Sequence, residues 1–133
     1  MTRLQLRYFV PLLTCLLLGC NTCSDQVSGE VLSADGVLNA TSFVRNCGAT
    51  TDLTSIVSIH RNDEGFRDDK SFVFVAKGRH QLVVTWVGPK ALSIRCPGCA
   101  RADIFREVTA LGHVDIVFDM ASALPTNPSG NKP

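Results

Sequence analysis

The stretch VSGEVLSADGVLNATSFVR, residues 27–45, predicts two antiparallel strands and the turn between them. Two segments rich in β-branched residues flank a Ser-Ala-Asp-Gly sequence, whose residue types favour a turn. A three-residue loop of Ala34, Asp35 and Gly36 places the glycine at the left-handed position that such a loop needs. We therefore expect a β-hairpin of Val27–Ser33 and Val37–Arg45.

The register of this hairpin brings two cysteines together. When Ser33 is paired with Val37, the numbers of paired residues add up to 70, and Cys23 and Cys47 satisfy the same sum. Residues paired across antiparallel strands lie within the Cα separation that a disulfide tolerates, so we expect a Cys23–Cys47 disulfide unless a bulge shifts the register. The bond would close a loop of about 25 residues and stabilise the fold by about 3 kcal/mol.

Further strands are expected downstream, where β-branched and aromatic residues recur between turn residues. After residue 19, no segment has apolar residues repeated at the spacing of a helix. Trp86 is expected in the core. The charged segment 61–70 is expected to form an exposed loop. The predicted fold class is all-β, a small antiparallel sheet, sandwich or open barrel. The later strands are predicted at about Thr54–His60, Ser71–Ala76, Gln81–Val87, Ala91–Arg95, and a last hairpin of Ile104–Val108, Leu111-Gly112 and Val114–Phe118.

The N-terminus has the pattern of an export signal. Arg3 and Arg7 precede an apolar run, residues 8–18, which is long enough for a helical signal peptide and too short to span a bilayer. The run ends in Leu-Leu-Gly-Cys, which resembles the lipobox of bacterial lipoproteins, although Leu18 is larger than usual. The resemblance implies that the thiol of Cys20 receives a diacylglyceryl group and that the chain is cleaved before it.

This pattern predicts four segments. Residues 1–19 are the signal peptide, 20–26 the lipidated anchor and a short linker, 27–120 a β domain, and 121–133 a disordered tail rich in proline and polar residues. The expected partner is the lipid bilayer of the cell membrane or outer membrane, which acylated Cys20 enters while the domain faces the periplasm or the exterior. Without Arg3 and Arg7, 11 Lys and Arg stand against 12 Asp and Glu, a balance that argues against nucleic acid as a partner.

The remaining cysteines lie in the motif Cys96-Pro97-Gly98-Cys99, whose Pro-Gly pair suits a type II turn. Three interpretations compete: a redox dithiol, a metal site with His80 or His113, and a structural disulfide formed locally or with another thiol. Thioredoxin-like enzymes place this motif at the start of a helix, whereas here it follows a predicted strand. We therefore favour the structural interpretation and expect disulfides to involve Cys23, Cys47, Cys96 and Cys99.

The run Ser33–Ile59 is similar to a family of small, uncharacterised bacterial lipoproteins that share an SPDG-like hairpin and a Cys-Gly-Ala-Thr-Thr segment. Later segments around Val73–Ala76, Trp86 and Ile104–Arg106 are similar as well. The resemblance implies that a cysteine shortly after the anchor accompanies the cysteine of the Cys-Gly-Ala-Thr-Thr segment, which matches Cys23 and Cys47. It implies a place in the envelope and no particular reaction.

Other candidate chemistry has a simpler explanation in each case. Residues 46–51 could form a small ligand-binding nest, but a turn held by side-chain hydrogen bonds is the simpler interpretation. Cys47 could be a nucleophile with His60 as its base, but the expected disulfide would consume its thiol. Asp63, Glu64 and the nearby acidic residues lack calcium-binding spacing. We expect a non-catalytic binding or structural domain with no metal, no cofactor and an unidentified envelope protein as a possible partner. The alternative is a thiol–disulfide exchange protein that acts through Cys96 and Cys99.

Overall fold

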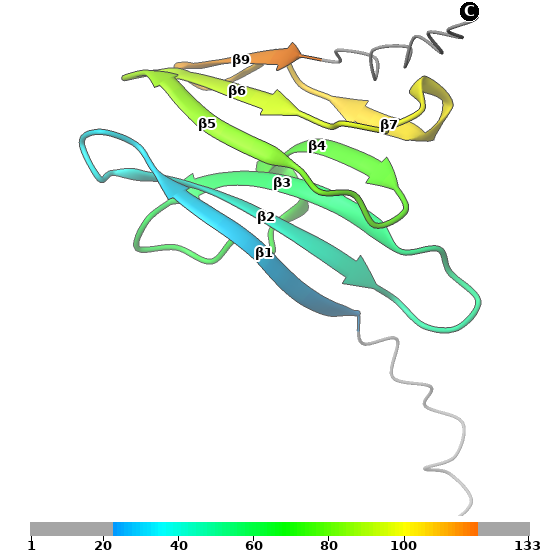
Figure 1. The fold of residues 1–133 in the computed structure, drawn as a ribbon. Helices are drawn as coiled ribbons and strands as arrows, with labels where there is room; N and C mark the ends of the chain where they lie inside the picture. Colours follow the sequence, from blue (N-terminus) through cyan, green and yellow to red (C-terminus); the bar gives the residue numbers. More distant parts are fainter. Residues whose placement is uncertain (1–22, 120–133) are drawn as a thin grey trace, which may run out of the picture.

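The computed structural model describes residues 23–119, so the predicted signal peptide 1–19, Cys20 and the tail 121–133 lie outside the described residues. The fold is all-β, as predicted, and its strands form two sheets (Figure 1). The five-stranded sheet has the order β1 (Ser24–Leu32), β2 (Leu38–Asn46), β3 (Thr54–Arg61), β4 (Phe72–Lys77) and β7 (Ile104–Glu107). The four-stranded sheet has the order β5 (Val83–Gly88), β6 (Ala91–Arg95), β9 (Val114–Asp119) and β8 (Ala110–Leu111). Single turns of 3₁₀ helix precede β4 (Asp69–Ser71) and β7 (Arg101–Asp103).

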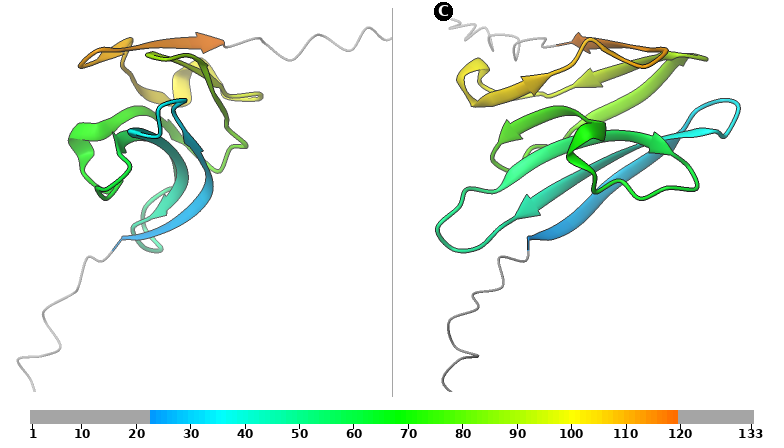
Figure 2. Two further views of the ribbon diagram at one scale, coloured as in Figure 1. Left: turned by 90° about the vertical axis from the view of Figure 1, so that its left-hand side faces the viewer. Right: turned by 180° about the vertical axis from the view of Figure 1, so that it is seen from behind.

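The two sheets pack face to face, as the two further views in Figure 2 show, and they share one core. Alternate residues of β2 and β3 point inward and meet alternate residues of β6 and β9, because successive side chains of a strand lie on opposite faces of the sheet. In β4 a register shift opposite Val57 and Ser58 interrupts this alternation, and the consecutive residues Val73 and Phe74 both belong to the core. The buried members of this core are Ala40, Val57, Ile59, Val73, Phe74, Ala76, Leu92, Ile94, Cys96, Val114 and Ile116.

The β1–β2 hairpin forms as predicted, but its register changes along the strands. Next to the turn, Leu32 is paired with Asn39, and Ser33 donates its backbone N–H to Leu38 O, so the loop has four residues rather than three. A β-bulge between Val27 and Gly29 then shifts the pairing by one position, and Ser24 is paired with Asn46. Strand β1 therefore starts before the predicted Val27 and takes in three residues expected in the linker.

The predicted hairpin of residues 104–118 forms only next to its turn, where β8 and β9 are antiparallel. Strand β7 is paired with β4 in the first sheet, and β6 and β9 are parallel. A two-residue turn at Gly112 and His113 joins β8 to β9, and only Ala110 and Leu111 are paired with β9. The backbone groups of β7 must then find partners elsewhere, and the free edge of β4 supplies them.

The loop 61–70 is exposed as predicted, except at Phe66, which is half-buried. Its charged residues face solvent, but Phe66 turns back and lies 4.9 Å from the ring of Phe43, on the face of the first sheet that points away from the main core. Phe72 completes this second cluster, with its ring 5.6 Å from that of Phe43. The loop therefore covers the outer face of β2 and β3 rather than forming only a solvated tip.

Trp86 packs against the main core as predicted and also connects the two sheets. Its indole Nε1–H donates to the carbonyl oxygen of Val31 in β1, 2.9 Å away. A buried indole N–H needs such a partner, so this bond fixes the edge of β5 against the edge of β1.

Candidate functional site

A cleft of about 570 Å³ opens at one end of the sandwich, where three turns meet the end of β3. The turns join β1 to β2, β5 to β6 and β8 to β9, and the first two lie together at the left of Figure 1. Leu38 and Ile59 belong to the core strands that reach the cleft, so its inner wall continues the core. The apolar lining residues are Val37, Leu38, Ile59, Pro89, Leu111 and Val114.

Charged groups of both signs surround this cleft. Asp35 and Glu64 contribute carboxylates, and Arg61 and Lys90 contribute cations. The Ser33 hydroxyl donates to Asp35 Oδ1 at 2.6 Å, the backbone N–H of Val37 donates to the same oxygen at 3.1 Å, and together these bonds lower the pKa of Asp35 below its ordinary value. The Asp35 carboxylate is therefore a fixed negative charge at neutral pH.

The Cys96–Cys99 motif forms the predicted turn and closes a local disulfide. The backbone N–H of Cys99 donates to Cys96 O at 3.2 Å, and Gly98 has a φ of 84°, the left-handed conformation that the third residue of a type II turn requires. The Cys96 side chain is buried in the main core, with 3% of its surface exposed, while Cys99 is half-buried. Cys99 is therefore the more accessible cysteine of the pair.

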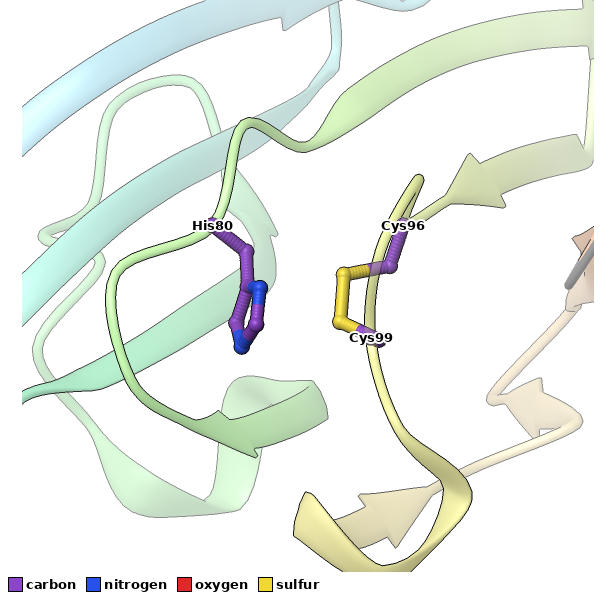
Figure 3. A group of neighbouring side chains, drawn as sticks. All are labelled: His80, Cys96 and Cys99. Atoms are coloured by element: carbon purple, nitrogen blue, oxygen red, sulfur yellow. A yellow bond between two sulfur atoms is a disulfide. The ribbon is translucent and has the colours of Figure 1, made fainter. Parts of the chain in front are cut away.

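His80 lies directly beside this disulfide, as Figure 3 shows. A ligand nitrogen of its ring and the two sulfur atoms all lie within 4.8 Å of one another. Among residues 23–119, these three side chains are the only such group of potential metal ligands. His113, the other partner considered from the sequence, lines the cleft at the opposite end of the sandwich.

The placement of His80 follows from the β5–β6 hairpin. Val83 is paired with Arg95 in this hairpin, so the residues just before Val83 lie opposite those just after Arg95. The sequence contains this signal, because the Gly88-Pro89 turn fixes which residues face each other. The same register argument that paired Cys23 with Cys47 would therefore have selected His80 over His113.

The other candidate residues have structural partners. Cys23 and Cys47 form the predicted disulfide, and in the turn that follows, Asn46 Oδ1 accepts from Gly48 N at 3.0 Å while the Thr51 hydroxyl donates to Gly48 O at 3.1 Å. These side-chain bonds agree with the turn interpretation of residues 46–51. In the acidic loop, Asp63 contacts Arg61.

His60, the base considered for Cys47, is almost fully buried. It has 9% of its surface exposed, on the outer face of the first sheet, and its ring lies 6.2 Å from that of Phe66 in the covering loop. Its Nε2 is 2.9 Å from the Thr41 hydroxyl, and its Nδ1 is 2.8 Å from Arg61 O. Both ring nitrogens are therefore engaged inside the protein.

No protein-family model, curated protein or solved structure matches this chain. In the part of the chain that the structure describes, no helix is long and apolar enough to cross a membrane. The lipoprotein resemblance of the sequence accordingly remains a prediction.

Proposed function

We propose that this chain is an envelope lipoprotein whose β-sandwich serves as a non-catalytic binding domain. The observation that carries the proposal is the position of the Cys23–Cys47 disulfide, three residues after the predicted lipid-bearing Cys20. Disulfides persist in exported proteins and are rare in the cytosol, so both disulfides of the domain favour export.

This arrangement would hold the domain close to the membrane and in one orientation. Three residues reach at most about 11 Å, so the sandwich would begin within that distance of the acylated Cys20. Strand β1 has nine residues and leads from Cys23 toward the cleft, a length of about 30 Å. The cleft would therefore face away from the bilayer and be open to a ligand.

The cleft favours a ligand with an apolar body and charged ends. Its inner wall is an extension of the apolar core, and Asp35 and Lys90 lie on the two turns that border it. Small-molecule sites commonly combine an apolar lining with a few polar groups that orient the ligand.

The anchor is tested by expressing the full chain in a bacterial host and separating membranes from soluble fractions. We expect the protein in the membrane fraction, with a mass that shows loss of residues 1–19 and acylation of Cys20. A Cys20→Ser variant should leave the membrane fraction. A wild-type protein that stays soluble with residues 1–19 intact would overturn the proposal.

The cleft is tested with anilinonaphthalene sulfonate, a fluorescent probe with an apolar body and one anionic group. We expect the folded protein to bind the probe and a Leu111→Glu variant to bind it at least tenfold more weakly, because the new carboxylate repels the sulfonate and removes apolar wall. Val87→Glu, an equally drastic change at an exposed position in β5, is the matched control. Equal binding by both variants would show that the probe lies elsewhere.

A second candidate function, thiol–disulfide exchange, is favoured by the position of His80 beside both sulfur atoms. The thiolate of a partner dithiol would attack Sγ of the accessible Cys99, and the S–S bond would break with Cys96 leaving as a thiolate. The second thiol of the partner would then release Cys99, so two electrons pass from the partner to the pair. A ring nitrogen of His80 lies within 4.8 Å of the sulfur atom that would leave as a thiolate.

The two functions differ in the reduction potential of the Cys96–Cys99 pair. Equilibration with glutathione or dithiothreitol buffers, followed by alkylation and mass spectrometry, measures this potential. A value above about −200 mV favours exchange, while a disulfide that resists reduction below about −300 mV supports a structural bond and excludes the second candidate.

A further inference from the structure

We propose that His80, Cys96 and Cys99 form a zinc site when the Cys96–Cys99 disulfide is reduced. The ligand atoms of these three residues lie within 4.8 Å of one another. Tetrahedral zinc with Zn–S bonds of about 2.3 Å and Zn–N bonds of about 2.0 Å needs its ligand atoms roughly 3.5 to 3.8 Å apart. Opening the disulfide would let the two sulfur atoms separate to this spacing, and the proposal holds whether or not the domain is lipid-anchored.

The imidazole of His80 is held in the orientation that a metal ligand needs. Its Nε2 lies 2.7 Å from the carbonyl oxygen of Lys77, which only accepts hydrogen bonds, so Nε2 carries the proton. The neutral ring therefore has its lone pair on Nδ1, and Figure 3 shows a ring nitrogen on the side of the two sulfurs. Histidines that bind metals commonly donate their other N–H to a backbone carbonyl in this way.

The backbone around His80 is fixed as well. Its N–H donates to the Ser55 hydroxyl at 2.8 Å, and the same hydroxyl donates to Gly78 O at 2.8 Å. A Cβ atom at position 78 would lie only 3.2 Å from His80 Nε2, so the glycine leaves the room that the ring occupies. These contacts place His80 without any contribution from the cysteines, so the ligand position would persist after the disulfide opens.

The donor set favours zinc over hard cations. Two thiolates and one imidazole are ligands for zinc and other borderline or soft metals, whereas calcium and magnesium take oxygen ligands. Cys96 is buried in the core and Cys99 and His80 are half-buried, so the site is enclosed on the protein side and keeps one open position. Three protein ligands with an open fourth position are typical of reactive zinc sites.

Metal binding would alternate with the disulfide. A dithiol reductant transfers two electrons to the S–S bond and is itself oxidised to a disulfide, which leaves Cys96 and Cys99 as thiols. Zinc then displaces one proton from each thiol and binds the two thiolates together with Nδ1. The oxidised pair has no thiolate to offer, so the site takes metal only in its reduced form.

The test uses the full-length protein, reduced anaerobically with a phosphine and exposed to Zn²⁺ in competition with a chromophoric chelator. Alkylation at intervals, followed by trypsin and mass spectrometry, identifies which thiols zinc protects. Arg95 and Arg101 flank the motif, so Cys96 and Cys99 fall in one peptide while Cys47 falls in another. Zinc should slow the alkylation of the Cys96–Cys99 peptide at least tenfold and leave that of Cys47 unchanged.

Two variants separate a ligand role for His80 from a structural one. His80→Gln retains an N–H that can donate to Lys77 O but removes the ligand nitrogen, and it should weaken zinc binding by at least about tenfold. His113→Gln, at the far end of the sandwich, should bind as the wild type does. Circular dichroism checks the fold of each variant. Zinc binding by the reduced and the oxidised wild-type protein is also compared, and this comparison does not depend on the folding of any variant. Wild-type affinity in His80→Gln, zinc binding to the oxidised protein, or equal protection of Cys47 would overturn the proposal.

Discussion

Cys23 is bonded to Cys47 across the β1–β2 hairpin, although the strand pairing next to the turn is shifted by one residue relative to the pairing next to the cysteines. The four-residue loop shifts the pairing by one position relative to the predicted three-residue loop, and the bulge at Ser28 shifts it back. The predicted disulfide is confirmed, but the uniform register from which it was derived is wrong. The two irregularities cancel, so the cysteines meet.

This relationship predicts opposite effects of one deletion and one insertion in β1. Deleting Ser28 removes the bulge and brings position 23 into the register of the turn, so the Cys23–Cys47 disulfide should still form. Inserting a second residue after Ser28 moves Cys23 out of line with Cys47, and the disulfide yield should fall severalfold. Mass spectrometry after alkylation without reductant measures the yield, and a deletion that loses the bond as completely as the insertion would contradict the prediction.

The two disulfides should differ in their contribution to stability. Replacing Cys23 and Cys47 together with serine should lower the free energy of unfolding by about 3 kcal/mol, because this bond closes a loop of 24 residues' separation. Replacing Cys96 and Cys99 with serine removes a bond between residues only three positions apart. This change should lower the free energy of unfolding by about 2 kcal/mol or less. Urea unfolding of the two double variants tests the order, which a larger loss at Cys96 and Cys99 would reverse.

The turns could be predicted from the sequence, because the residue types within each turn determine its conformation. Glycine at position 36 and the Pro97-Gly98 pair are confirmed in the turns that they predicted, since Gly36 and Gly98 both adopt positive φ. The pairing of β7 with β4 and the parallel neighbours β6 and β9 were missed, because they depend on which strand edges remain free after the local hairpins form.

The candidate sites illustrate the same limit. The cleft is built from three turns and the end of β3, so its existence depends on how the two sheets are placed on each other. His80 was recognised from the sequence as one of two possible partners of the cysteines, and only the register of the β5–β6 hairpin distinguishes it from His113. The cover over His60 includes Phe66, the one large apolar side chain of the loop 61–70.

Removing one partner of the buried ion pair near the start of β1 should destabilise the fold. Arg45 Nε lies 2.8 Å from Asp25 Oδ1, and Nη2 lies 3.1 Å from Oδ2, while the Asp25 side chain has only 4% of its surface exposed. The guanidinium also lies 5.0 Å from the ring centre of Phe72. Arg45→Met should lower the free energy of unfolding by about 3 kcal/mol, because it leaves a buried carboxylate without its main partner.

Two controls accompany this prediction: a double variant at Asp25 and Arg45, and an arginine-to-methionine change in an exposed ion pair. Adding Asp25→Val to Arg45→Met removes both charges and should recover most of the lost stability, since an apolar pair replaces the ion pair. Arg61→Met breaks an exposed pair with Asp63 and should leave urea unfolding unchanged. No recovery in the double variant would mean that Arg45 acts through its contacts with the aromatic rings instead.

The carboxyl group of Asp35 should titrate below its ordinary pKa of 3.8, because the Ser33 hydroxyl and the backbone N–H of Val37 both donate to it. The lowered pKa in the folded state means that the charged carboxylate favours folding above pH 3.8, and this contribution is lost as the pH falls through the lower, folded-state value. Ser33→Ala removes the largest cause and should raise the pKa of Asp35, whereas Ser28→Ala within β1 should leave it unchanged. Titration of the Asp35 carboxyl by NMR measures both variants. A pKa that stays equally low in Ser33→Ala would show that the turn backbone alone holds the charge, and it would remove the hydroxyl of Ser33 from the electrostatics of the cleft.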